Sequence, residues 1–156
     1  MNLSDEEAYS IRELTNSQVI ELISNLDIKP LLILTKENNF TIEEDIINIL
    51  RKLGVPNYLK GYNCLVKSIL KMIELGLDIP ITKELYPLVA KELNMSNTQV
   101  EKDMRKAIEV TWSNIDPSIV DRLFGYTINV NKDHPTNSHF IITIAKYILN
   151  KHKRID

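Results

Sequence analysis

The sequence predicts an all-α protein, and three observations support this fold class. Most of the 156 residues lie in stretches whose apolar side chains recur with the 3.6-residue period of an amphipathic helix. Capping residues, glycines and prolines stand at the boundaries of these stretches. Only residues 126–130 (YTINV) alternate in the way that is typical of a strand. Hydrophobic residues make up 44% of the chain, which is enough for one sizeable core.

Caps and apolar periods place the helices along the chain. Residues 17–26 form the first predicted helix, and an ambiguous apolar piece follows at 30–35. A capping box that begins at Thr41 starts the next helix. Asp116, followed by a proline, caps a later helix that ends at Gly125. The remaining helices are expected at 61–75, 82–93 and 97–110, and from 136–138 to 151.

Charge is unevenly distributed along the chain, whose net charge is −2. Residues 1–39 carry seven acidic and three basic side chains, whereas the remaining residues carry fourteen acidic and sixteen basic ones. The polar sequence KENN (36–39) separates the two parts. We therefore expect an acidic, helical N-terminal arm at 1–39 and one domain at 40–156.

Several classes of protein are disfavoured by what the sequence lacks. Cys64 is the single cysteine, and no hydrophobic run is long enough for a membrane span or a signal peptide, so we expect a cytoplasmic protein without membrane contact. The three histidines, at 134, 139 and 152, do not have the spacing of metal ligands. No phosphate-binding glycine loop and no GxSxG motif is present. The sequence therefore predicts neither an enzyme nor a cofactor or metal site.

The segment from 82 to 112 has the features of a helix-turn-helix. Two short helices that cross steeply need a small residue at their contact and a residue that tolerates left-handed backbone in the turn. Ala90 and Asn94 meet these two needs. Apolar anchors stand at matching offsets, at Leu93, Met95, Val100 and Met104.

A helical wheel divides the second helix of this motif into an apolar and a polar face. The apolar face holds Val100, Met104, Ala107, Ile108 and Thr111. The polar face holds Thr98, Gln99, Lys102, Arg105, Lys106 and Glu109. Lysine and arginine reach phosphates or guanine, and glutamine can pair with adenine, so this face has the residue types of a major-groove reader. A face that is merely solvated is the alternative.

From about Thr41 onward the sequence resembles the C-terminal DNA-binding effector domain of the stage-zero sporulation response regulator A family. The blocks that carry the resemblance are LGVPNYLKGY (53–62), ITKELYPLVAK (81–91), VEKDMRKAIEVTW (100–112), LFGYTINV (123–130) and PTNSHF (135–140). The resemblance implies a six-helix bundle that contains a helix-turn-helix and binds double-stranded DNA, often as a tandem dimer. It also implies that the LFGYT block, with Phe124 and Tyr126, lies where the family contacts RNA polymerase sigma factor, although a place in the core, with Trp112, is the favoured role of these aromatic residues.

The wheel, the resemblance and the predicted helix start at 136–138 together define the expected DNA contacts. A helix start favours an anion, so its free N–H groups are expected to clamp a phosphate, although a plain N-cap role is the alternative. The expected contacts are Thr82, Lys83, Thr98, Gln99, Glu101, Lys102, Arg105, Lys106, Glu109, Thr136, Asn137 and Ser138. The chain departs from the family's typical recognition run, RVERAIRHAIEVAW, at Gln99, Lys102, Asp103, Met104, Lys106 and Thr111. Lysine at 102 lacks the planar fork with which arginine grips guanine.

The sequence favours a DNA-binding transcription regulator of a spore-forming bacterium. The arm is too short for the receiver domain that the resemblance would place before this domain, so we expect the chain to act without a phosphoreceiver of its own. The alternative is a protein-interaction antagonist that pairs with the full-length regulator or with sigma factor. Residues 83–109 balance five basic against five acidic side chains, which keeps this alternative open because DNA binding normally needs a basic surplus. A homodimer is the other expected partner.

The first prediction concerns residues 1–39, which could cover the basic face, mediate dimers or bind a partner. Their net charge of −4, against +2 for the rest, makes them a competitor for cationic side chains that would otherwise meet phosphates. Deleting residues 1–39 should therefore tighten operator binding, most clearly at low salt, because salt screens such charges over about 8–10 Å. Titrations at two salt concentrations would measure this. If the deletion abolishes binding while the domain stays folded and monomeric, the arm is a dimerisation element.

Overall fold

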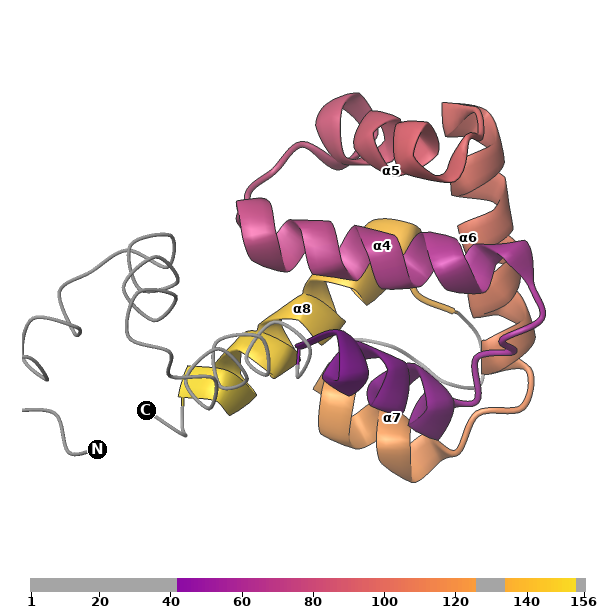
Figure 1. Cartoon of the computed structure of the whole chain (residues 1–156). Helices are drawn as coiled ribbons and strands as arrows, with labels where there is room; N and C mark the ends of the chain where they lie inside the picture. The colour runs from indigo at the N-terminus through magenta and orange to yellow at the C-terminus, as the bar shows by residue number, and fades with distance from the viewer. Residues whose placement is uncertain (1–41, 126–133, 154–156) are drawn as a thin grey trace, which may run out of the picture. The chain divides into compact units, whose positions relative to one another are not determined.

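The computed structural model describes residues 42–125 and 134–153, in which every regular element is a helix (Figure 1). The all-α prediction is thus confirmed for this part of the chain. The chain divides into two units, residues 1–41 and 42–156. The predicted helix at 17–26, the apolar piece at 30–35, the cap at Thr41 and the strand-like YTINV all lie outside the described residues. No described helix is long and apolar enough to cross a membrane.

The helices follow one another with short connections. A first helix spans residues 42–53. It is followed by α4 (Lys60–Leu75), a π-helical turn η1 (Ile81–Leu85) that runs into α5 (Tyr86–Leu93), α6 (Asn97–Trp112), α7 (Pro117–Phe124) and α8 (Asn137–Lys153). When η1 and α5 are taken as one unit, the described ranges contain the six helices that the resemblance implies.

The start of α5 differs from the prediction, which placed one regular helix from residue 82. The N–H of Tyr86 donates to the carbonyl of Ile81, five residues earlier, so the chain enters α5 through a wide π-helical turn. Pro87 explains the difference, because its ring lacks an N–H and would clash with the carbonyl four residues before it in a regular helix. The wide turn relieves that clash at the cost of one regular hydrogen bond.

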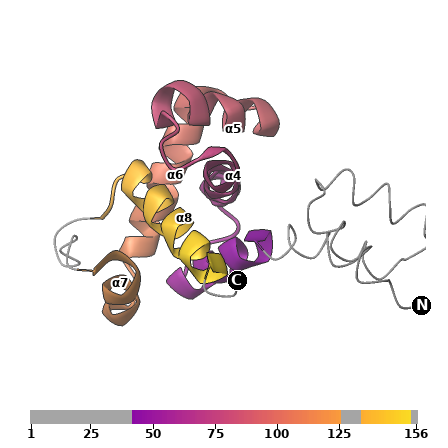
Figure 2. The same cartoon turned by 90° about the vertical axis from the view of Figure 1, so that its left-hand side faces the viewer.

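Helix α4 is the centre of the bundle. It contacts α5, α6, α8 and η1, and Figure 2 looks along its axis with α6 and α8 beside it. Cys64, Leu65, Ile69 and Met72 are fully buried on α4. Burial, with the charge of Asp103 nearby, raises the pKa of the Cys64 thiol to about 11, so this cysteine is a small core residue and not a reactive thiol.

Two helices approach each other closely at Gly61, in the first turn of α4. A Cβ at this position would lie 2.6 Å from the carbonyl carbon of Asp103 on α6, closer still to its oxygen, and 2.9 Å from the Cβ of Ala107. Backbone atoms cannot turn aside as a flexible side chain can. The α4–α6 crossing therefore requires glycine here.

The turn of the predicted helix-turn-helix has the expected geometry. Asn94 adopts left-handed backbone (φ 55°, ψ 51°), and Met95 donates its N–H to the carbonyl of Ala90 to close α5. The thiol of Cys64 lies 3.8 Å from the sulfur of Met95, so the residue after the turn contacts α4. The anchors Val100 and Met104 are fully buried, as the wheel predicted.

Helix α7 also follows its sequence signals. The Asp116 side chain accepts the N–H of Ser118, Pro117 is the first helical residue, and Gly125 ends the helix at φ 61°. Phe124 packs edge-to-face against Trp112, with ring centroids 5.2 Å apart. This aromatic contact joins α7 to the end of α6.

A buried carboxylate ties the helix of residues 42–53 to the end of α8. Asp45 accepts from Lys151 Nζ (3.0 Å) and from His152 Nε2 (2.8 Å). Burial raises the pKa of Asp45, but the hydrogen bonds and charges of Lys151 and His152 outweigh this and hold the pKa below its usual value. The stabilisation from this cluster is therefore present at neutral pH and is lost as the pH falls through the lowered pKa.

The second prediction concerns Gly61→Ala. In the interior of an ordinary helix this change raises stability by about 1 kcal/mol, because glycine has the lower helix propensity. Here we expect the opposite sign, a loss of about 1–3 kcal/mol, because the new Cβ forces α4 and α6 apart. Chemical denaturation would measure the change. Gly54→Ala is the control, since nothing lies within 4 Å of its Cβ position and only its φ of 80° opposes the substitution. A Gly61→Ala variant more stable than the parent would contradict the close crossing.

Candidate nucleic-acid interface

The polar face of α6 is exposed along four turns. Ser96 caps the helix by accepting the N–H of Gln99 (3.1 Å), so the first turn is well anchored. The side chains of the predicted polar face, Thr98, Gln99, Lys102, Arg105, Lys106 and Glu109, are all exposed. The residues of the opposite face, Val100, Met104, Ala107, Ile108 and Thr111, are all buried. The wheel therefore separated the two faces correctly.

Two acidic side chains of the helix-turn-helix form ion pairs with basic side chains of the protein. Glu92 pairs with Lys71 (2.8 Å) and Lys67 (3.3 Å) of α4, and these contacts, led by the hydrogen bond from Lys71, hold the pKa of Glu92 below its usual value. Glu101 pairs with Arg105 one turn away. These ion pairs compensate the charges of two of the five acidic side chains in residues 83–109, whereas Glu84 and Glu109 are exposed.

Two lysines of α6 remain as uncompensated cations. Within residues 42–125 and 134–153, neither Lys102 nor Lys106 forms an ion pair with a carboxylate. Glu109 lies 3.5 Å from His134 Nε2, an attraction that operates only when the imidazole is protonated. The centre of the exposed face is thus more basic than the sequence count indicates.

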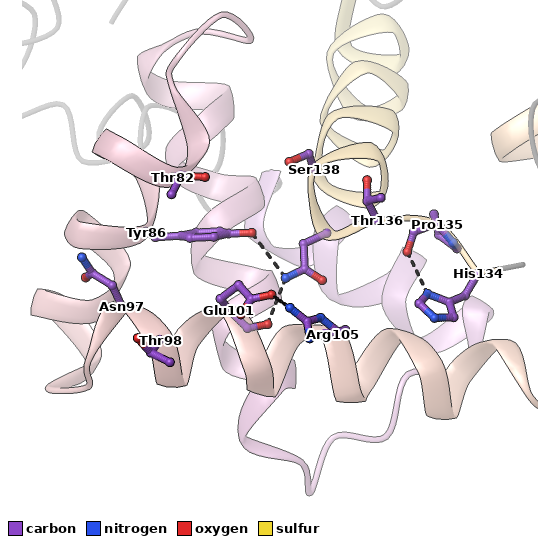
Figure 3. A pocket seen from close by; sticks show the side chains of 11 residues that line it. Thr82, Tyr86, Asn97, Thr98, Glu101, Arg105, His134, Pro135, Thr136 and Ser138 are labelled. Atoms are coloured by element: carbon purple, nitrogen blue, oxygen red, sulfur yellow. Dashed lines mark hydrogen bonds and ion pairs between the residues drawn. The ribbon is translucent and has the colours of Figure 1, made fainter.

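An open groove runs between the helix-turn-helix and the start of α8 (Figure 3). It brings together η1, the first half of α6 and the residues that lead into α8. Seven of the expected DNA contacts line it: Thr82, Thr98, Glu101, Arg105, Thr136, Asn137 and Ser138. Residues separated by more than fifty positions in the sequence therefore share one surface.

Asn137 holds the two walls of this groove together. Its side-chain amide donates to the backbone carbonyl of Glu101 (3.0 Å) and to the hydroxyl of Tyr86 (3.3 Å). The residue is buried, so its side chain fastens the start of α8 to α6 and α5 instead of reaching outward. Asn137 thus positions the site, a role that the sequence did not indicate.

The start of α8 is open to solvent beside this link. Thr136 is exposed and its hydroxyl accepts the N–H of His139 (3.1 Å), so it is the N-cap. Ser138 is half-buried and lines the groove. The first N–H groups of a helix and the helix dipole favour an anion. This end of α8 lines the same groove as the first half of α6.

Other expected contacts lie at the edge of this surface or outside it. Lys83 is exposed on η1 without lining the groove, and Gln99 faces a second hollow beside the start of α4, together with Lys60 and Asn63. Phe124 is in the core, where its ring packs against Trp112, which agrees with the core role weighed against the polymerase contact that the resemblance implies. Tyr126, its expected partner in that contact, lies outside the described residues.

Four residues of the groove were not among the expected contacts: Tyr86, Asn97, His134 and Pro135. Tyr86 could not have been found from local sequence, since its hydroxyl meets Asn137 across 51 positions. Asn97 is the first residue of α6, and the preference of recognition helices for contacts at their N-terminus was a usable signal. Within the described ranges no three His, Cys, Asp or Glu side chains are grouped to hold a metal ion.

The third prediction concerns Asn137→Ala. The change leaves the buried hydroxyl of Tyr86 without this partner and frees the start of α8 from α6, so we expect a loss of about 1–3 kcal/mol in stability. Thermal denaturation would measure it. Ser138→Ala is the matched control, since it truncates the next residue of α8 without touching the link and should stay close to the parent. Equal melting temperatures for Asn137→Ala and the parent would contradict the positioning role.

A comparison with known protein families gives a match within the unit of residues 42–156. The family model described as sporulation initiation factor Spo0A C terminal matches residues 46–148. The matched range covers the helix-turn-helix, α7 and most of α8, and with them every residue of the groove. The resemblance seen in the sequence blocks is thereby confirmed.

Proposed function

The chain belongs to the family of sporulation initiation factor Spo0A C-terminal domains, and from this premise we propose that it regulates transcription by placing α6 in the major groove of double-stranded DNA. The family is one of helical DNA-binding regulator domains and not an enzyme family. We propose that the chain acts in the cytoplasm of a spore-forming bacterium, where its DNA target lies.

The observation that carries this proposal is the shared groove of α6 and α8. An α-helix is about 10–12 Å wide with its side chains, which fits a major groove about 12 Å wide. When α6 lies in the major groove of DNA, the start of α8, which lines the same protein groove, lies at the edge of the major groove beside the phosphates. One element thus reads bases while another holds the backbone, and Asn137 fixes the spacing between them.

The side chains divide these tasks by their chemistry. Lys102 and Lys106 are exposed cations without an internal ion pair among the described residues, so they are available to phosphates or guanine. Arg105 is paired with Glu101, which restrains its guanidinium over the groove. Binding DNA would place phosphates in competition with this carboxylate for the Arg105 guanidinium. The ion pair thus orients Arg105 in the free protein and opens when a phosphate replaces the carboxylate. Thr82, Lys83 and the start of α8 supply neutral and cationic contacts to the backbone.

A second candidate function rests on a different surface. An apolar groove with basic edges lies between the helix of residues 42–53, α7 and α8. It is lined by Ile49, Lys52, Ile119, Arg122, Leu123 and Tyr147. This surface suits a protein partner such as sigma factor or a second copy of the regulator, and a protein that used it without binding DNA would be an interaction antagonist.

The fourth prediction is the loss of specific DNA binding in a Lys102→Ala, Arg105→Ala, Lys106→Ala triple variant. All three side chains are exposed, so the fold should be unchanged. Each good base contact contributes about 1–3 kcal/mol of discrimination, so we expect affinity for a DNA fragment selected from a random pool to fall at least about 100-fold. Fluorescence anisotropy would measure it.

The control for this variant carries Arg51→Ala, Lys146→Ala and Lys153→Ala, which remove the same charges from exposed positions on other helices. It should lose only the weak, general attraction to DNA. Parent-like binding by the α6 variant would contradict the major-groove assignment. A parent that binds sigma factor and shows no selection of DNA would favour the antagonist.

A further inference from the structure

Gln99 lies in the first turn of α6 and its side chain takes an unusual direction. Ser96 and Gln99 have the spacing of a capping box, in which the glutamine side chain folds back to the N–H of the capping serine. Here the Ser96 half is formed, since its hydroxyl accepts the N–H of Gln99. The Gln99 amide instead points forward along the helix, and its Nε2 donates to Asp103 Oδ1 over 2.9 Å.

Asp103 is held firmly by its surroundings. Its backbone carbonyl faces Gly61 at the closest point of the α4–α6 crossing. Its second carboxylate oxygen, Oδ2, is buried and has no hydrogen-bond partner within the described part of the protein. A carboxylate enclosed on one side cannot turn freely, so Oδ1 remains directed at Gln99. A buried carboxylate oxygen without a hydrogen-bond partner lowers the stability of the fold. This cost indicates that Asp103 has a role other than stabilising the fold.

The chemistry of this pair fixes the orientation of the Gln99 amide. A carboxylate only accepts hydrogen bonds, so the amide must turn its NH₂ group toward Asp103 and its carbonyl oxygen, Oε1, away from it. Gln99 is exposed in the first turn of α6, beside the hollow at the start of α4, and the N-terminal part of a recognition helix is the region that contacts base edges. On the proposed DNA-binding function, we propose that Asp103 is a positioning residue that sets base preference by presenting Gln99 with its oxygen toward the DNA.

This orientation selects bases that carry an amino group in the major groove. Adenine presents N6–H and cytosine N4–H, and both can donate to Oε1. Guanine presents only the acceptors N7 and O6 at this edge, and thymine presents O4 and a methyl group, so both face an acceptor with an acceptor. A free glutamine amide could turn over and donate to guanine. Asp103 opposes that rotation and occupies one of the two N–H groups of Nε2, so the pair favours adenine and cytosine over guanine and thymine.

A purely structural role for Asp103 predicts a different result. A hydrogen bond between residues four apart on a helix stabilises the helix for every DNA sequence alike. The negative charge of Asp103 likewise repels the phosphates of every sequence alike. Only a positioning role changes the ratio of affinities between bases at one position, so that ratio is the informative readout.

The experiment uses the full chain and a DNA fragment selected from a random pool. The position read by Gln99 is the one whose base preference disappears in Gln99→Ala. At that position the dissociation constants of the parent should favour adenine or cytosine over guanine by about tenfold. In Asp103→Ala the ratio should fall to about threefold or less while preferences elsewhere persist. In the double variant the ratio should equal that of Gln99→Ala alone, because Asp103 acts through Gln99.

Glu74→Ala is the matched control, since it removes one exposed carboxylate from the far end of α4 and should leave all base ratios unchanged. Asp103→Asn keeps the size of the side chain but can accept or donate, so it should also relax the preference and serves if Asp103→Ala does not fold. An unchanged adenine or cytosine preference in folded Asp103 variants would overturn the positioning role alone. A parent that selects no DNA would instead overturn the proposed function and this inference with it.

Discussion

The contact between the backbones of α4 and α6 at Gly61 is the constraint on which the site depends. A side chain at this position would overlap the carbonyl of Asp103, so glycine sets the distance between the central helix and the recognition helix. Val100, Met104, Ala107 and Ile108 are buried on one face of α6, and the opposite face is turned to solvent. The exposure of that polar face is therefore a consequence of packing on the other side of the helix.

Polar contacts of two kinds convert this packing into a defined surface. Asn137 fastens the start of α8 to the carbonyl of Glu101, so the position of this helix end depends on that of α6. The ion pairs of Glu92 with α4, and of Glu101 with Arg105, occupy carboxylates that would otherwise oppose DNA. A helix-turn-helix whose formal charges balance can thus present a basic centre, because Glu92 and Glu101 are paired while Lys102 and Lys106 form no ion pair among the described residues.

Local rules predicted the parts of this structure that local sequence determines. The left-handed Asn94, the Asp116 cap and the two faces of α6 follow from backbone preferences and the 3.6-residue period, and each was found where the sequence placed it. The π-helical turn before α5 was not predicted, although Pro87 indicates that a regular helix cannot continue through this position. Contacts between residues far apart in the sequence, such as Asn137 with Tyr86, could not be predicted from any short segment of it.

Sequence patterns were also weak at deciding which polar or aromatic residue of a block faces outward. Asn137 was expected to touch DNA and is buried, whereas the sequence left Phe124 open to a core or a partner role, and it lies in the core. Short segments such as 135–140 carry too few apolar positions to define a face, so burial there depends on what packs against them. The role of Asp103 is of the same kind, because its burial is created by α4.

Amide chemical shifts of the full chain, followed by NMR during titration with a selected DNA fragment, test the central claim most directly. If α6 enters the major groove while the start of α8 holds the backbone, the largest shifts should fall on residues 97–106 and 136–139. Residues of α7 and of the 42–53 helix should be nearly unaffected. Shifts confined to α7 and residues 42–53, with α6 unchanged, would contradict this account of the interface.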